Sequence, residues 1–118
     1  MESIWRKTCT IEERETLNRE IQTEVAVIGA GMAGLLTAYQ LKKAGVQAVV
    51  LEAKRIGSGQ TKNTTAKITS QHGLFCDAFI RKKGQKTAGQ YVQANQKAIE
   101  EYEQIIQENN IECDFERT

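Results

Sequence analysis

The sequence has no long apolar run, few cysteines, no excess of charge of either sign and no proline. No apolar run approaches the roughly 18–20 residues of a membrane-spanning helix, so we expect no such helix. Residues 1–7 carry a basic pair without a following apolar stretch, which argues against a secretory signal. The 16 basic residues balance 15 acidic ones, so the charge indicates no nucleic-acid partner. The absence of proline assigns no function.

The three cysteines, Cys9, Cys76 and Cys113, are too widely spaced to form a C-x-x-C motif, a zinc site or a disulfide framework. Reduced thiols of this kind are typical of a cytoplasmic protein, and we expect that location and no metal site. A length of 118 residues allows one domain.

A strand, a glycine-rich turn and a helix are predicted in succession near the N-terminus. Residues 24–28 are apolar and predict the strand, and residues 32–44 predict the helix. Gly29, Gly31 and Gly34 lie between and within them at G-x-G-x-x-G spacing. In this fingerprint the first glycine permits a tight turn, the second admits a pyrophosphate, and the third lets the helix pack closely on the strand. The helix N-terminus then offers free N–H groups to phosphates.

Glu52 closes a second apolar run, residues 46–52, which predicts a second strand. It lies 18 residues after Gly34. A carboxylate at this place accepts hydrogen bonds from the adenosine ribose and repels a 2′-phosphate, so NADP is disfavoured. The alternative is an ordinary strand-end charge beside an ordinary turn. We prefer a dinucleotide site because strand, glycines, helix, strand and acid all keep the spacing of the fingerprint.

The second half of the chain predicts a loop, two helices and the start of a strand. Residues 53–73 form the loop, rich in glycine, serine, threonine and lysine. Apolar periodicity predicts a helix over 74–83 and a longer one over 85–109, whose apolar stripe we expect to pack in a core. Residues 111–115 predict the start of another strand.

The predicted organisation is an N-terminal arm, residues 1–23, followed by a partial dinucleotide-binding domain, residues 24–118. The arm is polar and predicts an extended segment with at most one helical turn. Both early strands are nearly continuous apolar runs, a pattern of parallel strands covered on both faces. Two such strands leave two hydrophobic edges unpaired. We therefore expect the chain to be the front of a longer protein, or an oligomer or partner chain to complete the sheet.

The loop after Glu52 decides between NAD and FAD. Gly57 and Gly59, with several hydroxyls and an amide between and after them, return toward the nucleotide. Such a loop can present backbone N–H groups and hydroxyls to a diphosphate from a second side. The alternative is a flexible surface loop.

Two stretches carry a family resemblance. V-A-V-I-G-A-G-M-A-G-L-L-T-A-Y-Q-L and then V-V-L-E-A-K-R-I-G-S-G-Q-T resemble the N-terminal FAD-binding region of the D-amino acid oxidase/glycine oxidase superfamily, which includes sarcosine oxidases and γ-glutamylputrescine oxidase-like enzymes. G-S-G-Q-T-K-N-T-T-A-K-I-T-S-Q-H-G is most similar to bacterial FAD-dependent oxidoreductases, some with a C-terminal Rieske domain. The resemblance implies an α/β fold: the N-terminal βαβ unit of a Rossmann-type FAD-binding domain, followed by helices, with an incomplete sheet.

The resemblance also implies which residues bind FAD, by their match to the family's motifs. Thr64 and Thr65 stand where many relatives have glycines. The implied residues are Gly29, Gly31 and Gly34 at the pyrophosphate, with Ala33 beside them; Glu52, Ala53 and Lys54 at the adenosine; Gly59, Gln60 and Thr61 at the phosphates; and Thr65 and Ala66 toward the isoalloxazine. The substrate implied for a full-length relative is a small amine or amino acid. No catalytic residue is assigned.

His72, the single histidine, has several interpretations. It is either a loop residue with a structural hydrogen bond, or a residue that lines the flavin pocket or acts as a base. A covalent flavin link is disfavoured, because in relatives with such a link the histidine lies closer to the second glycine element.

The leading functional hypothesis is the FAD-binding front end of an amine- or amino-acid-oxidising flavoprotein that is not catalytic by itself. The alternatives are a nucleotide-binding subunit that acts with a partner chain, an NAD-dependent oxidoreductase, and a helical interaction module built on residues 74–109.

Overall fold

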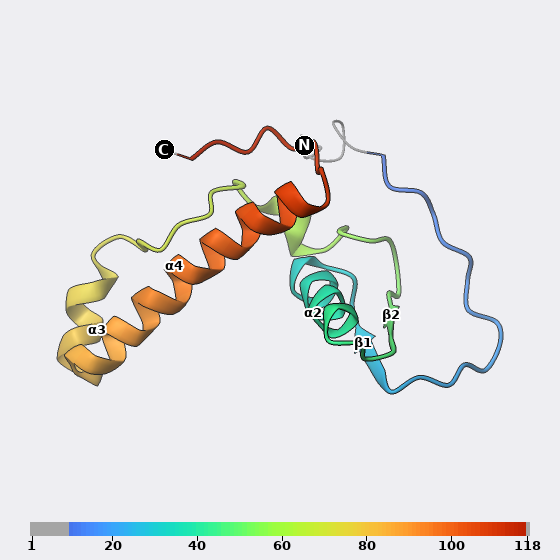
Figure 1. The fold of residues 1–118 in the computed structure, drawn as a ribbon, viewed down its shortest axis with the longest axis horizontal. Helices are drawn as coiled ribbons and strands as arrows, with labels where there is room; N and C mark the ends of the chain where they lie inside the picture. Colours follow the sequence, from blue (N-terminus) through green and yellow to red (C-terminus); the bar gives the residue numbers. More distant parts are fainter. Residues whose placement is uncertain (1–9, 118) are drawn as a thin grey trace. The chain divides into compact units, whose positions relative to one another are not determined.

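The computed structural model describes residues 10–117 and divides the chain into two compact units, Met1–Thr65 and Ala66–Thr118. The first unit holds two strands, a helix and a 3₁₀ turn, and the second holds two helices (Figure 1). Their bounds are β1 Val25–Ile28, α2 Met32–Lys43, β2 Ala48–Leu51, η1 Gln60–Asn63, α3 Phe75–Lys83 and α4 Gln85–Glu108. The predicted order of strand, helix, strand and two further helices is confirmed.

The first unit is a strand–helix–strand unit with a two-stranded parallel sheet. The register pairs Val25 with Ala48 and Ile28 with Leu51. Beyond the paired residues, the Gly29 N–H donates to the Leu51 carbonyl at 2.7 Å. Both strands therefore end at the same edge of the sheet, and the glycine turn lies directly beside the end of β2.

The end of α2 is set by Gly45, which has a φ of +76°. The Gly45 N–H donates to the Lys42 carbonyl at 3.0 Å, and the Val46 N–H donates to the Leu41 carbonyl at 2.9 Å. This pair of bonds is the Schellman motif, in which a left-handed residue is needed after the last helical turn. Glycine adopts that conformation without strain, so the helix ends here and the chain returns into β2.

One face of the sheet is covered by α2, which packs against both strands. Side chains of β1 alternate: Val25 and Val27 are half-buried, whereas Ala26 and Ile28 are exposed, Ile28 to 78%. The face of β1 that carries Ala26 and Ile28 is therefore uncovered in the part of the chain that the structure describes, although the apolar pattern of β1 is typical of a strand covered on both faces. The physical reason is that α2 is the one helix of the first unit in residues 10–65.

Residues 10–23 of the N-terminal arm form neither helix nor strand, so the predicted helical turn is absent from them. Residues 1–9 of the arm lie outside the described residues. The arm joins the sheet at its end, where the Thr23 hydroxyl donates to the Gln47 carbonyl at 2.9 Å. Further back, Glu13 forms an ion pair with Arg55.

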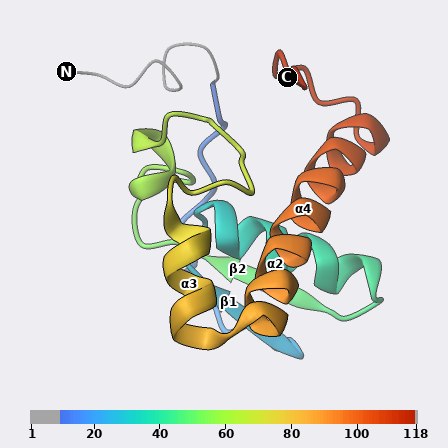
Figure 2. The same cartoon turned by 90° about the vertical axis from the view of Figure 1, so that its left-hand side faces the viewer.

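The second unit is a hairpin of α3 and α4, which lie next to each other in Figure 2. Gly84, with a φ of +82°, is the single residue between them. Phe75 and Phe79 of α3 stack at 5.0 Å between ring centroids, and Tyr91 of α4 meets them at 5.5 and 5.4 Å. The apolar stripe of α4 thus packs on α3 at its N-terminal end, as the periodicity predicts.

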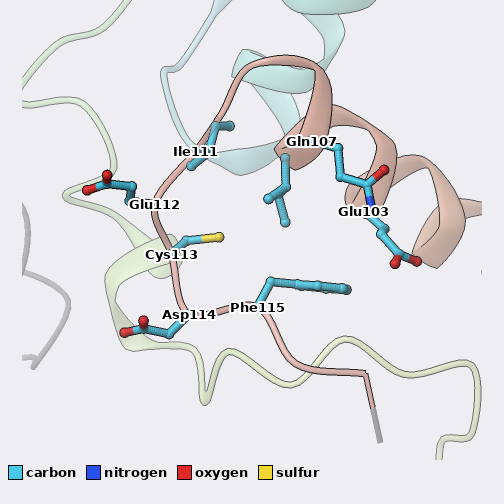
Figure 3. A pocket seen from close by; sticks show the side chains of 8 residues that line it. Glu103, Gln107, Ile111, Glu112, Cys113, Asp114 and Phe115 are labelled. Atoms are coloured by element: carbon cyan, nitrogen blue, oxygen red, sulfur yellow. The ribbon is translucent and has the colours of Figure 1, made fainter.

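The predicted strand over 111–115 is wrong. Asn110 and Asp114 both have a φ of +49°, which is incompatible with an extended strand. The segment instead turns back at the end of α4, and the Arg117 guanidinium bonds the Glu103 carboxylate at 2.9 Å. Residues 111–115 and the last turns of α4 surround an open hollow of about 560 Å³ (Figure 3). Of the apolar residues in this segment, Ile111 and Cys113 are exposed and Phe115 is half-buried, and no strand is present among residues 66–117 to pair with them.

Candidate functional site

The glycine loop, Gly29–Gly31, connects the end of β1 to the start of α2. Gly29 has a φ of +98°, a conformation that side chains rarely adopt, so the turn requires glycine. Gly31 is the residue before α2 and makes no side-chain cap hydrogen bond. The first amides of α2 therefore have no side-chain cap from the preceding residue and must find partners elsewhere.

Gly34 lies in the first turn of α2, where the helix meets the glycine loop. A Cβ at this position would lie 1.9 Å from the Gly29 carbonyl oxygen and 3.4 Å from Val27 Cγ1. The first distance is far below any van der Waals contact, and backbone atoms cannot rotate away as a side chain can. The third glycine of the fingerprint therefore serves the close helix–strand packing that the sequence predicts.

Glu52, directly after β2, holds the glycine loop to the turn that follows the strand. Its Oε2 accepts the Ala30 N–H at 2.9 Å, and its Oε1 accepts the Lys54 N–H at 2.9 Å. These backbone donors, Ala30 first, hold the pKa of the Glu52 carboxyl below its ordinary value. Ala30 itself is only 2% exposed. The carboxylate is thus fixed, ionised, beside the glycine loop.

A second loop, residues 57–63, returns to the same place and ends in η1. The Gly57 N–H donates to the Ala30 carbonyl at 2.9 Å, so both polar groups of the Ala30 backbone are bound. The Thr61 hydroxyl accepts the N–H of Met32, the first residue of α2, at 3.0 Å. The glycine loop, Glu52 and the second loop therefore form one cluster in the first unit.

The structure brings together most of the residues that the sequence assigns to cofactor binding. Gly29, Gly31, Ala33, Gly34, Glu52, Ala53, Lys54, Gly59, Gln60 and Thr61 lie in or next to these three segments. Thr65 is the last residue of the first unit and Ala66 is the first residue of the second, so the structure does not test their predicted place at the flavin. Ala66 has a φ of +55°, a conformation that glycine adopts more readily.

The sequence reasoning missed the backbone N–H groups of Ala30 and Met32, which donate hydrogen bonds to the Glu52 carboxylate and the Thr61 hydroxyl. Both are x positions of the fingerprint, and no side-chain type marks them. The spacing of the glycines is the one sequence signal that could have located these amides.

His72 belongs to the second unit, where its ring centroid lies 6.1 Å from that of Tyr91 in an edge-on arrangement. This is a ring contact and not a hydrogen bond, so the structural hydrogen bond of the histidine stays a prediction. Its predicted role at a flavin stays a prediction as well.

The comparisons with known proteins can now be added to this geometry. The family model described as FAD dependent oxidoreductase matches residues 24–118. The chain belongs to this family. The resemblance seen in the glycine fingerprint and the loop after Glu52 is therefore confirmed.

Three curated relatives match most of this chain. It is 37% identical over 114 residues to a putative Rieske 2Fe-2S iron-sulfur protein, YhfW, of Bacillus subtilis (97% of this chain, 22% of that protein). It is 32% identical over 101 residues to the gamma-glutamylputrescine oxidoreductase of Escherichia coli (86% and 24%). The probable oxidoreductase OrdL of Haemophilus influenzae is 28% identical over 94 residues (80% and 22%). The chain thus spans about a quarter or less of each relative. No solved structure matches it.

The site has the chemistry that a dinucleotide diphosphate requires. A helix N-terminus without a side-chain cap from Gly31, a glycine turn on which α2 packs closely at Gly34, and a fixed carboxylate all lie at one edge of the sheet. These are the elements that hold FAD in βαβ nucleotide sites. Among residues 10–117, no cluster of metal-binding side chains is present. No helix in that range is long and apolar enough to cross a membrane.

The Glu52 contacts predict a dependence of stability on pH. Since the folded-state pKa of Glu52 lies below the ordinary value of about 4.3, its contribution is present above that pH and is lost as the pH falls through the folded-state pKa. We expect the free energy of unfolding of wild type to exceed that of Glu52→Gln at pH 7 and this difference to shrink at pH 3. Urea denaturation followed by circular dichroism measures it.

Glu20→Gln is the matched control, because Glu20 is an exposed glutamate of the arm in the same unit. It corrects for the loss of one carboxylate among many. A difference between wild type and Glu52→Gln that is the same at both pH values would contradict the backbone clamp.

Proposed function

We propose that residues 24–118 are a partial FAD-binding domain of Rossmann type, with residues 1–23 as an arm, and that the chain provides the FAD site of an oxidoreductase. The observation that carries this proposal is the cluster of the glycine loop, Glu52 and the second loop at one edge of the sheet. Membership in the FAD dependent oxidoreductase family supports FAD as the dinucleotide.

We expect different residues of the cluster to bind different parts of the cofactor. Gly31, Ala33 and Gly34 would receive the diphosphate at the start of α2, because glycine admits its close approach and the helix N-terminus favours its negative charge. Glu52 would accept the ribose hydroxyls of the adenosine half. Gly59 and Gln60 of the second loop would meet the phosphates from the other side, with Thr61 next to them in the same loop.

We further propose that the substrate class is an amine or amino acid. One relative is named a gamma-glutamylputrescine oxidoreductase, and this name supports oxidation at a carbon next to nitrogen. When bound, FAD supplies the acceptor for the hydride, and the protein supplies position and electrostatics. We assign binding of the cofactor to this chain, and we assign no catalytic residue.

The proposal is tested by titrating the 118-residue chain with FAD, NAD and NADP in parallel. We expect saturable binding of FAD, seen as a change in flavin fluorescence, and no saturable response to NAD or NADP by calorimetry. Ala30, whose backbone groups are both bound within the cluster, should then become still better protected from hydrogen exchange when FAD is added.

Two results would contradict the proposal. Binding of NAD without FAD would assign the site to a nicotinamide cofactor. A folded chain that responds to none of the three would contradict the proposal that this chain by itself provides the FAD site.

A further inference from the structure

Hydrogen bonds of two kinds join the second loop to the glycine loop and the start of α2. One is the bond at 3.0 Å between the Met32 N–H and the Thr61 hydroxyl, which joins residues 29 positions apart in the sequence. Another is the backbone bond from the Gly57 N–H to the Ala30 carbonyl at 2.9 Å. The Thr61 hydroxyl is a side-chain group, so its bond can be removed by substitution without altering the backbone.

The Thr61 hydroxyl occupies a defined place at the start of α2. Met32 is the first helical residue, and Gly31 before it makes no side-chain cap hydrogen bond. The first N–H groups of a helix lack partners within the helix, and a hydroxyl ordinarily binds them from the residue just before it. Here Thr61 provides this bond from the second loop, and the backbone of η1 is thereby positioned beside the glycine loop.

The space for this contact depends on Gly31. A Cβ at position 31 would lie 3.3 Å from Thr61 Oγ1, so with alanine there the hydroxyl would have to shift by a few tenths of an ångström and its bond to Met32 would lengthen. The close contact between positions 31 and 61 thus exists in the protein itself, apart from any approach of a phosphate. The effects of changes at positions 31 and 61 should then depend on each other.

We propose that Thr61 is a positioning residue, which fastens the second loop to the N-terminus of α2 through the Met32 N–H and sets the distance between the two sides of the diphosphate site. This inference rests on the proposed function for its role in FAD binding, but the fastening itself exists in the cofactor-free chain. Thr61 acts through Met32, so its loss should alter the order of the loop before FAD is added.

The test compares Thr61→Val, which has a similar shape and no hydroxyl, with Thr61→Ser, which keeps the hydroxyl. In the cofactor-free chain we expect exchange of the Met32 amide proton, measured by NMR, to be about fivefold faster in Thr61→Val and nearly unchanged in Thr61→Ser, since one such hydrogen bond contributes a factor of about this size. We expect FAD binding to weaken about fivefold in Thr61→Val and to be largely restored in Thr61→Ser.

A double-mutant cycle with Gly31→Ala adds a second measurement, Met32 exchange without cofactor, which would not change if Thr61 acted only by contacting a phosphate. In the cofactor-free chain, Gly31→Ala should speed Met32 exchange in the wild-type background and have little further effect in Thr61→Ala, which has no hydroxyl to displace. Additive effects of the two changes would overturn the proposal.

The outcomes separate this inference from the proposed function. Weaker FAD binding in Thr61→Val with unchanged Met32 exchange would make Thr61 a direct contact and overturn the positioning role. Faster Met32 exchange with unchanged FAD binding would also overturn it, because the fastening would then have no effect on the cofactor. A wild-type chain that binds no FAD would contradict the proposed function. In that case the exchange of the Met32 amide proton alone tests whether Thr61 holds the second loop to α2. Faster exchange in Thr61→Val would support this contact, and unchanged exchange would overturn it.

Discussion

Replacing Gly34 by alanine is expected to destabilise the first unit by about 3 kcal/mol and to abolish FAD binding. The added Cβ would lie 1.9 Å from the Gly29 carbonyl oxygen, so α2 must move away from the glycine loop. Because Gly29 also donates its N–H to Leu51, this movement disturbs the bond that holds the loop to β2. Urea denaturation followed by circular dichroism, together with FAD titration, measures both effects.

Gly89→Ala is the matched control, because it makes the same change inside helix α4. A Cβ at position 89 meets no atom within 4 Å. Alanine in a helix interior is more favourable than glycine by about 0.5–1 kcal/mol, so this variant should be at least as stable as wild type and bind FAD equally. If Gly34→Ala behaved like Gly89→Ala, the close packing of α2 on the loop would be wrong.

Replacing Glu52 by alanine is the second change with a large expected effect, a loss of FAD affinity of about a hundredfold. Two causes combine. The ribose hydroxyls lose their proposed acceptor, and the Ala30 and Lys54 N–H groups lose the carboxylate that they bind. Glu52→Gln should lose less, because its amide oxygen can still accept one of these hydrogen bonds while its NH₂ group cannot accept the other.

Glu20→Ala is the control for this series, since it also removes one exposed carboxylate from the first unit. It should leave FAD affinity unchanged, as measured by the same titration. Equal FAD affinity in Glu52→Ala and Glu20→Ala would contradict both the ribose contact and the clamp on the glycine loop.

The parts of the fold that follow from local sequence could be predicted. Residues 24–28 and 46–52 are apolar runs bounded by turns, and they contain the observed strands. Gly45 and Gly84 stand where left-handed backbone ends a helix or separates two, and both have positive φ. The roles of Gly29 and Gly34 were also predictable, because the fingerprint fixes their spacing relative to strand and helix.

The parts that depend on distant contacts could not be predicted. The bond between Thr61 and Met32 joins segments that no local pattern relates. Residues 111–115 have an apolar pattern that fits a strand, but they pack at the end of α4 with Asp114 in a left-handed conformation. Likewise, the apolar character of β1 predicts cover on two faces, whereas Ile28 remains largely exposed.

The amide NMR spectrum of the isotopically labelled chain, recorded with increasing FAD, tests the central claim most directly. The account predicts saturable shifts at Gly31, Ala33 and Gly34 together with Gly59 and Thr61, at one common affinity, and unchanged signals in the aromatic cluster of α3 and α4. Shifts confined to residues 66–117, or shifts at the glycine loop without any in the second loop, would contradict a diphosphate site built from both loops.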